Sequence, residues 1–444
     1  MRKFLTFAVV SFSLVLATKA AQPPNVILIL ADDMCVGDVA VFNGGRNRTP
    51  NIDRLIGEGL WFDRAYSGSC VCAPARAALL TGRYPHRTGV VSLPLDTEPE
   101  FTRLKRDETT LADVFAANGY RTGLVGKWHV GLGEGYGPVA RGFQEVAVFH
   151  GSDKGGYNRY ILHTDDRMEE KPKPQDTYLT DELNRRAIDF VRRHANTPFF
   201  LHLAHYAPHR PLQAPEESIE PYVKAGFDRE TATVYAMIEI MDRGIGELMQ
   251  ELDALGLRER TLVLFASDNG PDPLVAPRFN HDLSGSKYTV NEGGIRVPFI
   301  LRQPGTVPVG KRGELVHFTD ILPTLVEHCG LKHESKPPLD GRSFAALLQD
   351  GGSFATPVRF WQWNRTRPNY THNAAMRDGP WKLVKPYVTH NQIKGDSDLL
   401  HALYNLDTDP VESTDLAEKH RERFQSMRTA LDAWSREVEN DRTR

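Results

Sequence analysis

Short apolar runs with no polar alternation constrain the fold of this chain most. Residues 25–30 read Asn-Val-Ile-Leu-Ile-Leu between Pro24 and Asp32, and similar runs cover residues 198–203 and 261–266. A half-exposed strand alternates apolar and polar residues, whereas these runs are typical of strands that are buried on both faces of a parallel sheet. The chain therefore has to cover both faces of that sheet with other structure.

Segments with helical periodicity separate the apolar runs. The longest of them places Val234, Met237, Ile238 and Met241 on one stripe that continues to Leu255, and we interpret this stripe as core. The other predicted elements are helices at residues 111–118 and 180–194 and a short strand at residues 123–125. Because strands alternate with helices, the pattern predicts an α/β fold with a mostly parallel central sheet flanked by helices.

The C-terminal part of the chain has a different pattern. A polar, proline-containing stretch at residues 332–338 is a candidate boundary. Short strand-like runs and one charged helix follow it, at residues 358–363, 374–377, 381–384 and 417–439. We therefore predict a large domain over residues 21–345 and a small α+β subdomain over residues 346–444, built from an antiparallel sheet and one helix.

The first 20 residues predict a cleaved secretory signal peptide. Met1-Arg2-Lys3 is followed by an apolar stretch over residues 4–16 and by small residues at positions 17–20. The apolar stretch is too short for a membrane-spanning helix, although an uncleaved anchor is the alternative. We expect an exported protein, periplasmic or secreted, without a stable membrane anchor.

Net charge and cysteine content disfavour nucleic-acid binding, a disulfide scaffold and a zinc site. The formal net charge is −3 and no long basic run occurs, which disfavours nucleic acid as a partner. The four cysteines, Cys35, Cys70, Cys72 and Cys329, are too few for a disulfide scaffold. Cys70 and Cys72 form a CxC pair, but no second pair is present to complete a zinc site.

Two acidic motifs come directly after two of the predicted strands. Asp32 and Asp33 follow the first apolar run, and Asp268 and Asn269 follow the run at residues 261–266. Functional groups gather at the carboxyl ends of parallel strands, so these side chains can converge on one cation. Three carboxylates and one amide oxygen suit Ca²⁺ or Mg²⁺ better than Zn²⁺. The alternative for an isolated Asp-Asp pair is a turn or a helix cap.

The string Cys-Ala-Pro-Ala-Arg at residues 72–76 predicts the start of a helix. Proline suits the first helical turn, and Gly82 can end the helix. Residue 72 would then lie just before a helix N-terminus, where free N–H groups favour an anion, and Arg76 would lie about one turn further on. A lone cysteine is more often a small buried apolar residue, so the functional interpretation depends on the whole string.

This string, followed by Leu-Thr-Gly at residues 80–82, resembles the signature of the formylglycine-dependent, arylsulfatase-like (type I) sulfatases of the alkaline phosphatase superfamily. The resemblance implies an alkaline-phosphatase-like large domain. It also implies that a maturation enzyme oxidises Cys72 to Cα-formylglycine, an aldehyde whose hydrate attacks sulfur. It further implies one Ca²⁺ beside residue 72, with residue 72 as a further ligand to those supplied by Asp32, Asp33, Asp268 and Asn269.

Further motifs match the same family. Residues 126–131 read Gly-Lys-Trp-His-Val-Gly, residues 207–209 read Ala-Pro-His, and residues 284–287 read Ser-Gly-Ser-Lys. Ser152 resembles a serine that some members place near the nucleophile, which makes it a candidate for substrate binding. The other residues that the resemblance assigns to the site through these motifs are Lys127, His129, His209 and Lys287.

The implied chemistry requires charge neutralisation and two proton transfers. Sulfate monoesters are anions, and Ca²⁺, the helix N-terminus and the side chains of Arg76, Lys127 and Lys287 would neutralise that charge. By resemblance, His209 would protonate the leaving alcohol. His129 would take the proton from the second hydroxyl of the hydrate when the aldehyde returns.

We therefore predict a sulfuric ester hydrolase that cleaves sulfate monoesters, with carbohydrates as the expected substrates. Its partners would be a sulfated small molecule or saccharide and a formylglycine-generating maturation enzyme. Two alternatives stay open: a phosphate or phosphonate monoester hydrolase of the same superfamily, and a sulfated-sugar binding protein in which Cys72 remains a thiol. Asn269 disfavours a two-zinc phosphatase, which would need histidine at such a position. The sequence identifies neither the sugar nor the sulfated position.

Overall fold

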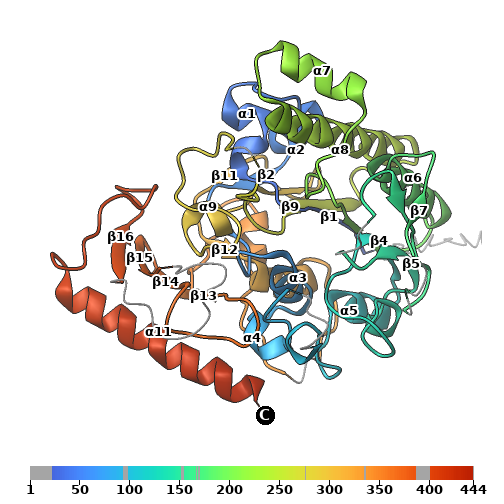
Figure 1. The fold of residues 1–444 in the computed structure, drawn as a ribbon. Helices are drawn as coiled ribbons and strands as arrows, with labels where there is room; N and C mark the ends of the chain where they lie inside the picture. The colour runs from blue at the N-terminus through green and yellow to red at the C-terminus, as the bar shows by residue number, and fades with distance from the viewer. Residues whose placement is uncertain are drawn as a thin grey trace, which may run out of the picture.

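An eight-stranded sheet in the order β11-β2-β10-β9-β1-β8-β4-β5 forms the centre of the molecule. Its strands are β1 Asn25–Ala31, β2 Leu60–Phe62, β4 Arg121–Lys127, β5 Glu145–Phe149, β8 Phe199–Ala204, β9 Thr261–Ser267, β10 Phe299–Arg302 and β11 Gly310–Arg312. Within this sheet only β10, which pairs antiparallel with β2 and β9, runs against the others. The predicted mostly parallel sheet is confirmed (Figure 1).

The computed structural model describes residues 23–93, 99–151, 155–166, 168, 171–275, 277–334, 337–386 and 401–443. The predicted signal peptide at residues 1–20 and the candidate Ser152 lie outside these residues. Within them, no helix is both long enough and apolar enough to cross a membrane.

Strand β1 shows how the sheet divides the core. Every residue of β1 is buried, and β1 pairs with β8 on one side and β9 on the other. Alternate side chains point to opposite faces of a strand, so Ile27 and Ile29 pack in one apolar cluster while Val26 and Leu28 pack in another. Burial on both faces explains why the run 25–30 lacks polar residues.

Helices cover both faces of the sheet (Figure 1). Helices α2 Pro50–Glu58, α6 Leu179–Arg193 and α8 Arg229–Ala254 contribute to the cluster around Ile27. Helices α3 Cys72–Thr81, α5 Leu111–Ala117 and α10 Ile321–His328 contribute to the cluster around Leu28. The predicted helices at 111–118, 180–194 and 234–255 are therefore confirmed, although α8 begins earlier because the side chain of Asp228 caps it at Thr231 N (2.9 Å).

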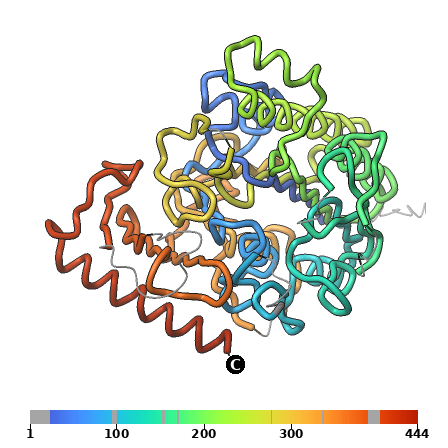
Figure 2. The backbone as a smooth tube through the Cα atoms, viewed as in Figure 1, coloured from blue at the N-terminus to red at the C-terminus, as the bar shows by residue number. Residues whose placement is uncertain are grey.

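A second, four-stranded antiparallel sheet lies along one side of the molecule (Figure 2). Its strands are β13 Arg359–Gln362, β14 Ala374–Asp378, β15 Trp381–Lys385 and β16 Ala402–Asn405. Helix α11 Arg421–Arg442 packs on it through Trp434, whose ring stacks on Phe360 with centroids 5.1 Å apart. The predicted antiparallel sheet with one helix is confirmed, and β16 is an additional strand.

Shorter elements connect these layers. They are α1 Ala40–Asn43, α4 Pro85–Thr88, α7 Glu216–Lys224, α9 Glu292–Ile295, β3 Ala65–Tyr66, β6 Arg159–Tyr160, β7 Lys173–Pro174 and β12 Val316–His317. All four cysteines are buried and none forms a disulfide.

Candidate active site

The two acidic motifs meet at the carboxyl edge of the central sheet. Ala31 at the end of β1 pairs with Ser267 at the end of β9, so the residues after each strand are neighbours. The backbone N–H of Asp33 donates to Asp268 Oδ1 (3.2 Å), and the Asn269 amide donates to Asp33 Oδ1 (2.6 Å). The convergence expected from the parallel sheet is thus present in the structure.

This edge carries buried oxygen atoms that fit a hard cation. Carboxylate oxygens of Asp32, Asp33 and Asp268 all lie within 4.8 Å of one another. Among the described residues, Asp32 Oδ1 and Asn269 Oδ1 are buried without a hydrogen-bond partner. Because an unpaired buried oxygen is costly, such atoms indicate a ligand, and an all-oxygen donor set suits Ca²⁺ or Mg²⁺.

The three carboxyl groups differ in how their surroundings affect ionisation. Burial, together with the negative charge of Asp32, raises the pKa of Asp268 to about 7. Burial is also the largest single influence on Asp32 and Asp33 and acts in the same direction, but the neighbouring positive groups together outweigh it and hold the pKa of both below the usual range. These groups are Lys127, His209 and Arg76 for Asp32, and Lys287 and His209 for Asp33. Ionising all three carboxyl groups together would be easier beside a cation.

Helix α3 begins at the predicted string, and Cys72 is its first residue rather than the residue just before it. Val71 is the extended N-cap residue, and Gly82 ends the helix with φ 70°, a left-handed conformation that glycine adopts readily. The Cys72 sulfur lies within 4.8 Å of an Asp32 carboxylate oxygen and a His209 ring nitrogen. Burial raises the pKa of the Cys72 thiol, so the unmodified side chain is a poor nucleophile at neutral pH.

Three basic side chains hold the carboxylates in place. Arg76 donates to Asp268 Oδ2 from Nε (2.9 Å) and Nη2 (2.7 Å). Lys127 Nζ pairs with Asp32 Oδ2 (2.5 Å), and Lys287 Nζ pairs with Asp33 Oδ2 (2.8 Å). Lys287 also lines the cavity described below, whereas Arg76 and Lys127 are buried behind the carboxylates.

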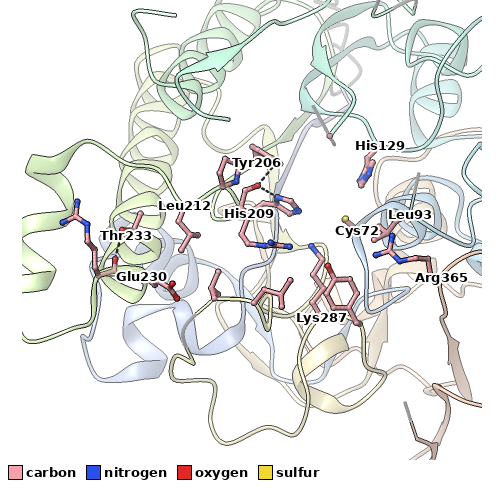
Figure 3. A pocket seen from close by; sticks show the side chains of 17 residues that line it. Cys72, Leu93, His129, Tyr206, His209, Leu212, Glu230, Thr233, Lys287 and Arg365 are labelled. Carbon is pink, nitrogen blue, oxygen red and sulfur yellow. Dashed lines mark hydrogen bonds between the residues drawn. The ribbon is translucent and has the colours of Figure 1, made fainter. Parts of the chain in front are cut away.

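Two histidines flank the opening above Cys72 (Figure 3). His209 Nδ1 lies 2.6 Å from the carbonyl oxygen of Arg210, so the neutral ring carries its proton on Nδ1 and directs Nε2 toward Asp33 Oδ2, 3.7 Å away. Burial, assisted by Lys287, lowers the pKa of His209 to about 4. Burial, assisted by Lys127, also lowers the pKa of His129 well below its usual range.

A cavity of about 990 Å³ opens above these groups. Cys72, His129, His209 and Lys287 line one part of it, and their side chains converge from separate segments of the chain (Figure 3). Six of the seven candidate catalytic and substrate-binding residues lie in or directly behind this part of the cavity, and the seventh is Ser152, which lies outside the described residues. The other histidines of the β8 segment, His202 and His205, are buried in the core.

Several residues at the site were not found by sequence reasoning. The Tyr157 hydroxyl donates to the carbonyl oxygens of Tyr206 and His209, both at 2.8 Å, and the Tyr206 ring stacks on His209. Asn373, the residue before β14, donates to the Tyr288 carbonyl (2.8 Å) and accepts from the Val290 N–H (3.1 Å). These residues fix the loops that carry His209 and Lys287, and no local motif marks such long-range contacts.

Comparison with known proteins places this geometry in one family. The sulfatase family matches residues 24–331, and the C-terminal family of N-sulphoglucosamine sulphohydrolase matches residues 283–438. Human N-acetylgalactosamine-6-sulfatase is 31% identical over 438 residues, covering 89% of this chain and 82% of the human protein. Human arylsulfatase A is 31% identical over 451 residues, covering 91% of this chain and 86% of that protein.

A solved structure agrees with these matches. The crystal structure of Ps i-CgsB in complex with k-i-k-neocarrahexaose has a TM-score of 0.81 and 32% sequence identity, and 93% of each chain is covered. The two family matches together span residues 24–438, which include both sheets. The chain therefore belongs to the sulfatase family, a family of sulfuric ester hydrolases within the alkaline phosphatase superfamily.

Proposed function

We propose that this sulfatase removes sulfate from carbohydrate sulfate esters, with residue 72 as the source of the nucleophile. The observation that carries the proposal is the position of Cys72 at the start of α3, beside unpaired carboxylate and amide oxygens and facing Lys287 and His209 in an open cavity. Support for a sugar substrate comes from the relatives, which include sulfatases named for N-acetylgalactosamine and a protein bound to a neocarrahexaose.

The oxygen-rich edge of the sheet would hold the cation, Ca²⁺ with Mg²⁺ as the alternative. Asp32 and Asn269 would contribute their unpaired oxygens, and Asp33 and Asp268 would contribute carboxylate oxygens. When bound, the cation supplies positive charge for the sulfate oxygens. Arg76 and Lys127 would keep Asp268 and Asp32 oriented toward it, a positioning role that their burial favours.

Conversion of Cys72 to formylglycine by a maturation enzyme would supply a hydrated aldehyde, whose two hydroxyls allow attack on sulfur and later release. The first turn of α3 presents free N–H groups at this residue, and they favour the negative charge of a sulfate. Lys287 lines the cavity beside it and would bind a sulfate oxygen. An unmodified thiol with a raised pKa fits this chemistry less well.

Two histidines are placed for proton transfer. His209 Nε2 faces the reacting end of the cavity, because Nδ1 is engaged by the Arg210 carbonyl. A bound sulfate raises the pKa of a neighbouring histidine, so His209 would carry a proton for the leaving sugar oxygen. His129 lines the cavity from the loop after β4 and would take a proton from residue 72.

We also propose that the protein is exported. The apolar stretch in residues 1–20 would direct the chain across a membrane and be removed, leaving a periplasmic or secreted enzyme. N-terminal sequencing of the protein isolated from its native source checks this: a mature N-terminus near residue 21 is expected, and an intact Met1 in the functional protein would contradict it.

A substrate panel tests the activity. Purified, matured protein is incubated with defined sulfated mono- and oligosaccharides and with the matched phosphate esters, and the release of each anion is measured. We expect sulfate release from a subset of the saccharides and none from Cys72→Ala. Release of phosphate alone would identify a phosphate or phosphonate ester hydrolase, and binding of sulfated sugars without turnover would identify a binding protein; either result contradicts the proposal.

A further inference from the structure

The cavity is larger than one sulfated sugar unit requires. A sulfated hexose has about sixteen non-hydrogen atoms, and even at the volume of one water each, roughly 30 Å³, it fills only about half of a 990 Å³ cavity. The remaining volume is continuous with the part lined by Cys72 and Lys287. It therefore has room for a second unit of a substrate bound at the reacting end.

A different set of residues lines this remaining part, which we call the distal pocket. It is bounded by Leu212 before α7, by Leu274 on the loop after β9, and by Arg229, Glu230 and Thr233 at the start of α8. Figure 3 shows Leu212, Glu230 and Thr233 on the side of the cavity away from Cys72 and His129. The distal pocket thus combines apolar side chains with groups that hydrogen-bond.

We infer that the distal pocket binds a second, uncharged sugar unit joined to the sulfated one. The inference rests on the proposed function and extends it, because it sets the length and charge of the substrate. A sugar ring presents C–H groups on its faces and hydroxyls at its edge. The C–H faces match apolar side chains such as Leu274. The hydroxyls match polar groups such as Thr233, whose own hydroxyl donates to the Arg229 carbonyl oxygen (2.6 Å) and can still accept from a sugar hydroxyl.

The charge of the distal pocket disfavours a second sulfate. Arg210, which also lines the cavity, pairs through Nε with Asp272 Oδ2 at 2.6 Å, and Arg229 Nη2 pairs with Glu216 Oε2 at 2.6 Å. Glu230 adds a negative charge to the lining. Since these arginines are already paired with carboxylates, a second anion would meet no excess of positive charge there.

Leu274 provides the sharpest probe of the distal pocket. Its side chain is 64% exposed although it is large and apolar, and it lies at the cavity rim. Substitution at an exposed position changes stability little, so Leu274→Ser should fold normally. Val309 is equally exposed at 65% but does not line the cavity, which makes Val309→Ser a matched control.

The experiment compares three substrates at matched concentration series. They are the sulfated monosaccharide that the enzyme turns over, the same unit linked to a neutral sugar, and the same unit linked to a sulfated sugar. We expect the neutral disaccharide to have a kcat/KM roughly 10-fold above that of the monosaccharide, the size of effect that one filled apolar pocket gives. Leu274→Ser should remove most of that gain without changing turnover of the monosaccharide, and Val309→Ser should change neither.

Three results would overturn the inference. They are equal kcat/KM for the monosaccharide and the neutral disaccharide, an equal loss on both substrates in Leu274→Ser, and a preference for the disaccharide with the second sulfate. In each case turnover of the monosaccharide persists and the proposed function stands. Absence of sulfate release from every saccharide of the substrate panel would reject both proposals together.

Discussion

Two clusters of buried charge in this molecule have similar composition and different surroundings. At the sheet edge, Asp32, Asp33 and Asp268 lie against three basic side chains. Between α9 and the second sheet, Lys382 Nζ pairs with Glu292 Oε1 and Glu412 Oε1, both at 2.9 Å. The first cluster borders the cavity through Lys287, and none of the second cluster's residues does.

The difference teaches that buried charge alone does not identify a site. In the second cluster, Glu292 also accepts from the Tyr66 hydroxyl (2.6 Å), and Glu412 Oε2 accepts from the Glu292 N–H (2.8 Å). Its charges are used in holding the second sheet to the motif around residues 292–298. The first cluster keeps unpaired oxygens on Asp32 and Asn269 at the end of a cavity. Glu412 Oε1 of the second cluster also lacks a hydrogen-bond partner, but it forms the ion pair with Lys382. Access to a cavity is therefore the feature that separates the ligand site from the structural one.

Substitution of Asp268 by Asn, at the open cluster, should have the largest effect on activity. The amide keeps the size of the side chain but removes a negative charge from the expected cation site. We expect loss of at least about 10²-fold in kcat/KM and loss of bound Ca²⁺ measured by elemental analysis and calorimetry. Thermal stability in the absence of metal should change little, because loss of the buried Arg76 pair is offset by relief of the burial cost and of the repulsion between Asp268 and Asp32. Full activity together with an unchanged metal content would show that Asp268 is not part of a cation site.

Substitution of His209 tests the reacting end of the cavity with two leaving groups. An unactivated sugar alkoxide needs a proton to leave, whereas a nitrophenolate does not. His209→Ala should therefore lose about 10²- to 10⁴-fold on a sulfated sugar and far less on an aryl sulfate. His129→Ala should slow both substrates alike, because it acts on residue 72. Equal losses in His209→Ala on both substrates, with a lower melting temperature, would assign His209 a structural role.

Substitution of Glu292 by Gln, at the closed cluster, should affect stability rather than chemistry. Removing one partner of a buried ion pair costs about 3 kcal/mol, because Lys382 and the neighbouring Arg377 lose a charge partner. We expect a lower melting temperature and denaturant midpoint, with kcat per folded molecule nearly unchanged. A large fall in kcat at wild-type stability would instead join this cluster to the active site.

The smallest expected effect concerns pH and lies near the second sheet. His86, which contacts Gln362 of β13 (2.9 Å), has its pKa lowered by burial to about 4, against an ordinary value of 6.5. Between these values the unfolded chain binds the proton and the native protein does not, so stability falls as pH drops from about 6.5 to 4. His86→Gln should be less stable at pH 7 and should lose less stability on acidification. Parallel stability curves for the two proteins would exclude this contribution.

The central strands and the acidic residues that follow them can be predicted from the sequence for a physical reason. A strand buried on both faces has to be apolar throughout. The runs at residues 25–30 and 261–266 can therefore be recognised as strands without knowing which strands they pair with. Asp32 and Asp268 follow from those strands, because parallel strands place their carboxyl ends together. The start of α3 at Cys72 follows from proline and glycine at the two ends of one helix.

Other features depend on contacts between distant segments. Asn373, the residue before β14, holds the Lys287 loop, and Tyr157 holds the His209 loop through two carbonyl oxygens. Neither contact leaves a periodic or local pattern in the sequence. Arg365 likewise reaches the cavity only because the second sheet packs against the segments around Cys70 and Tyr288. The predicted domain limits and the role of Ser152 stay predictions.

The chemical state of residue 72 tests the central claim most directly. Active enzyme is digested, and the peptide that contains residue 72 is examined by mass spectrometry and by labelling with a hydrazide, which reacts with aldehydes. We predict an aldehyde at residue 72, in a fraction that rises with specific activity across preparations. A fully active enzyme whose residue 72 is an unmodified thiol would contradict the account.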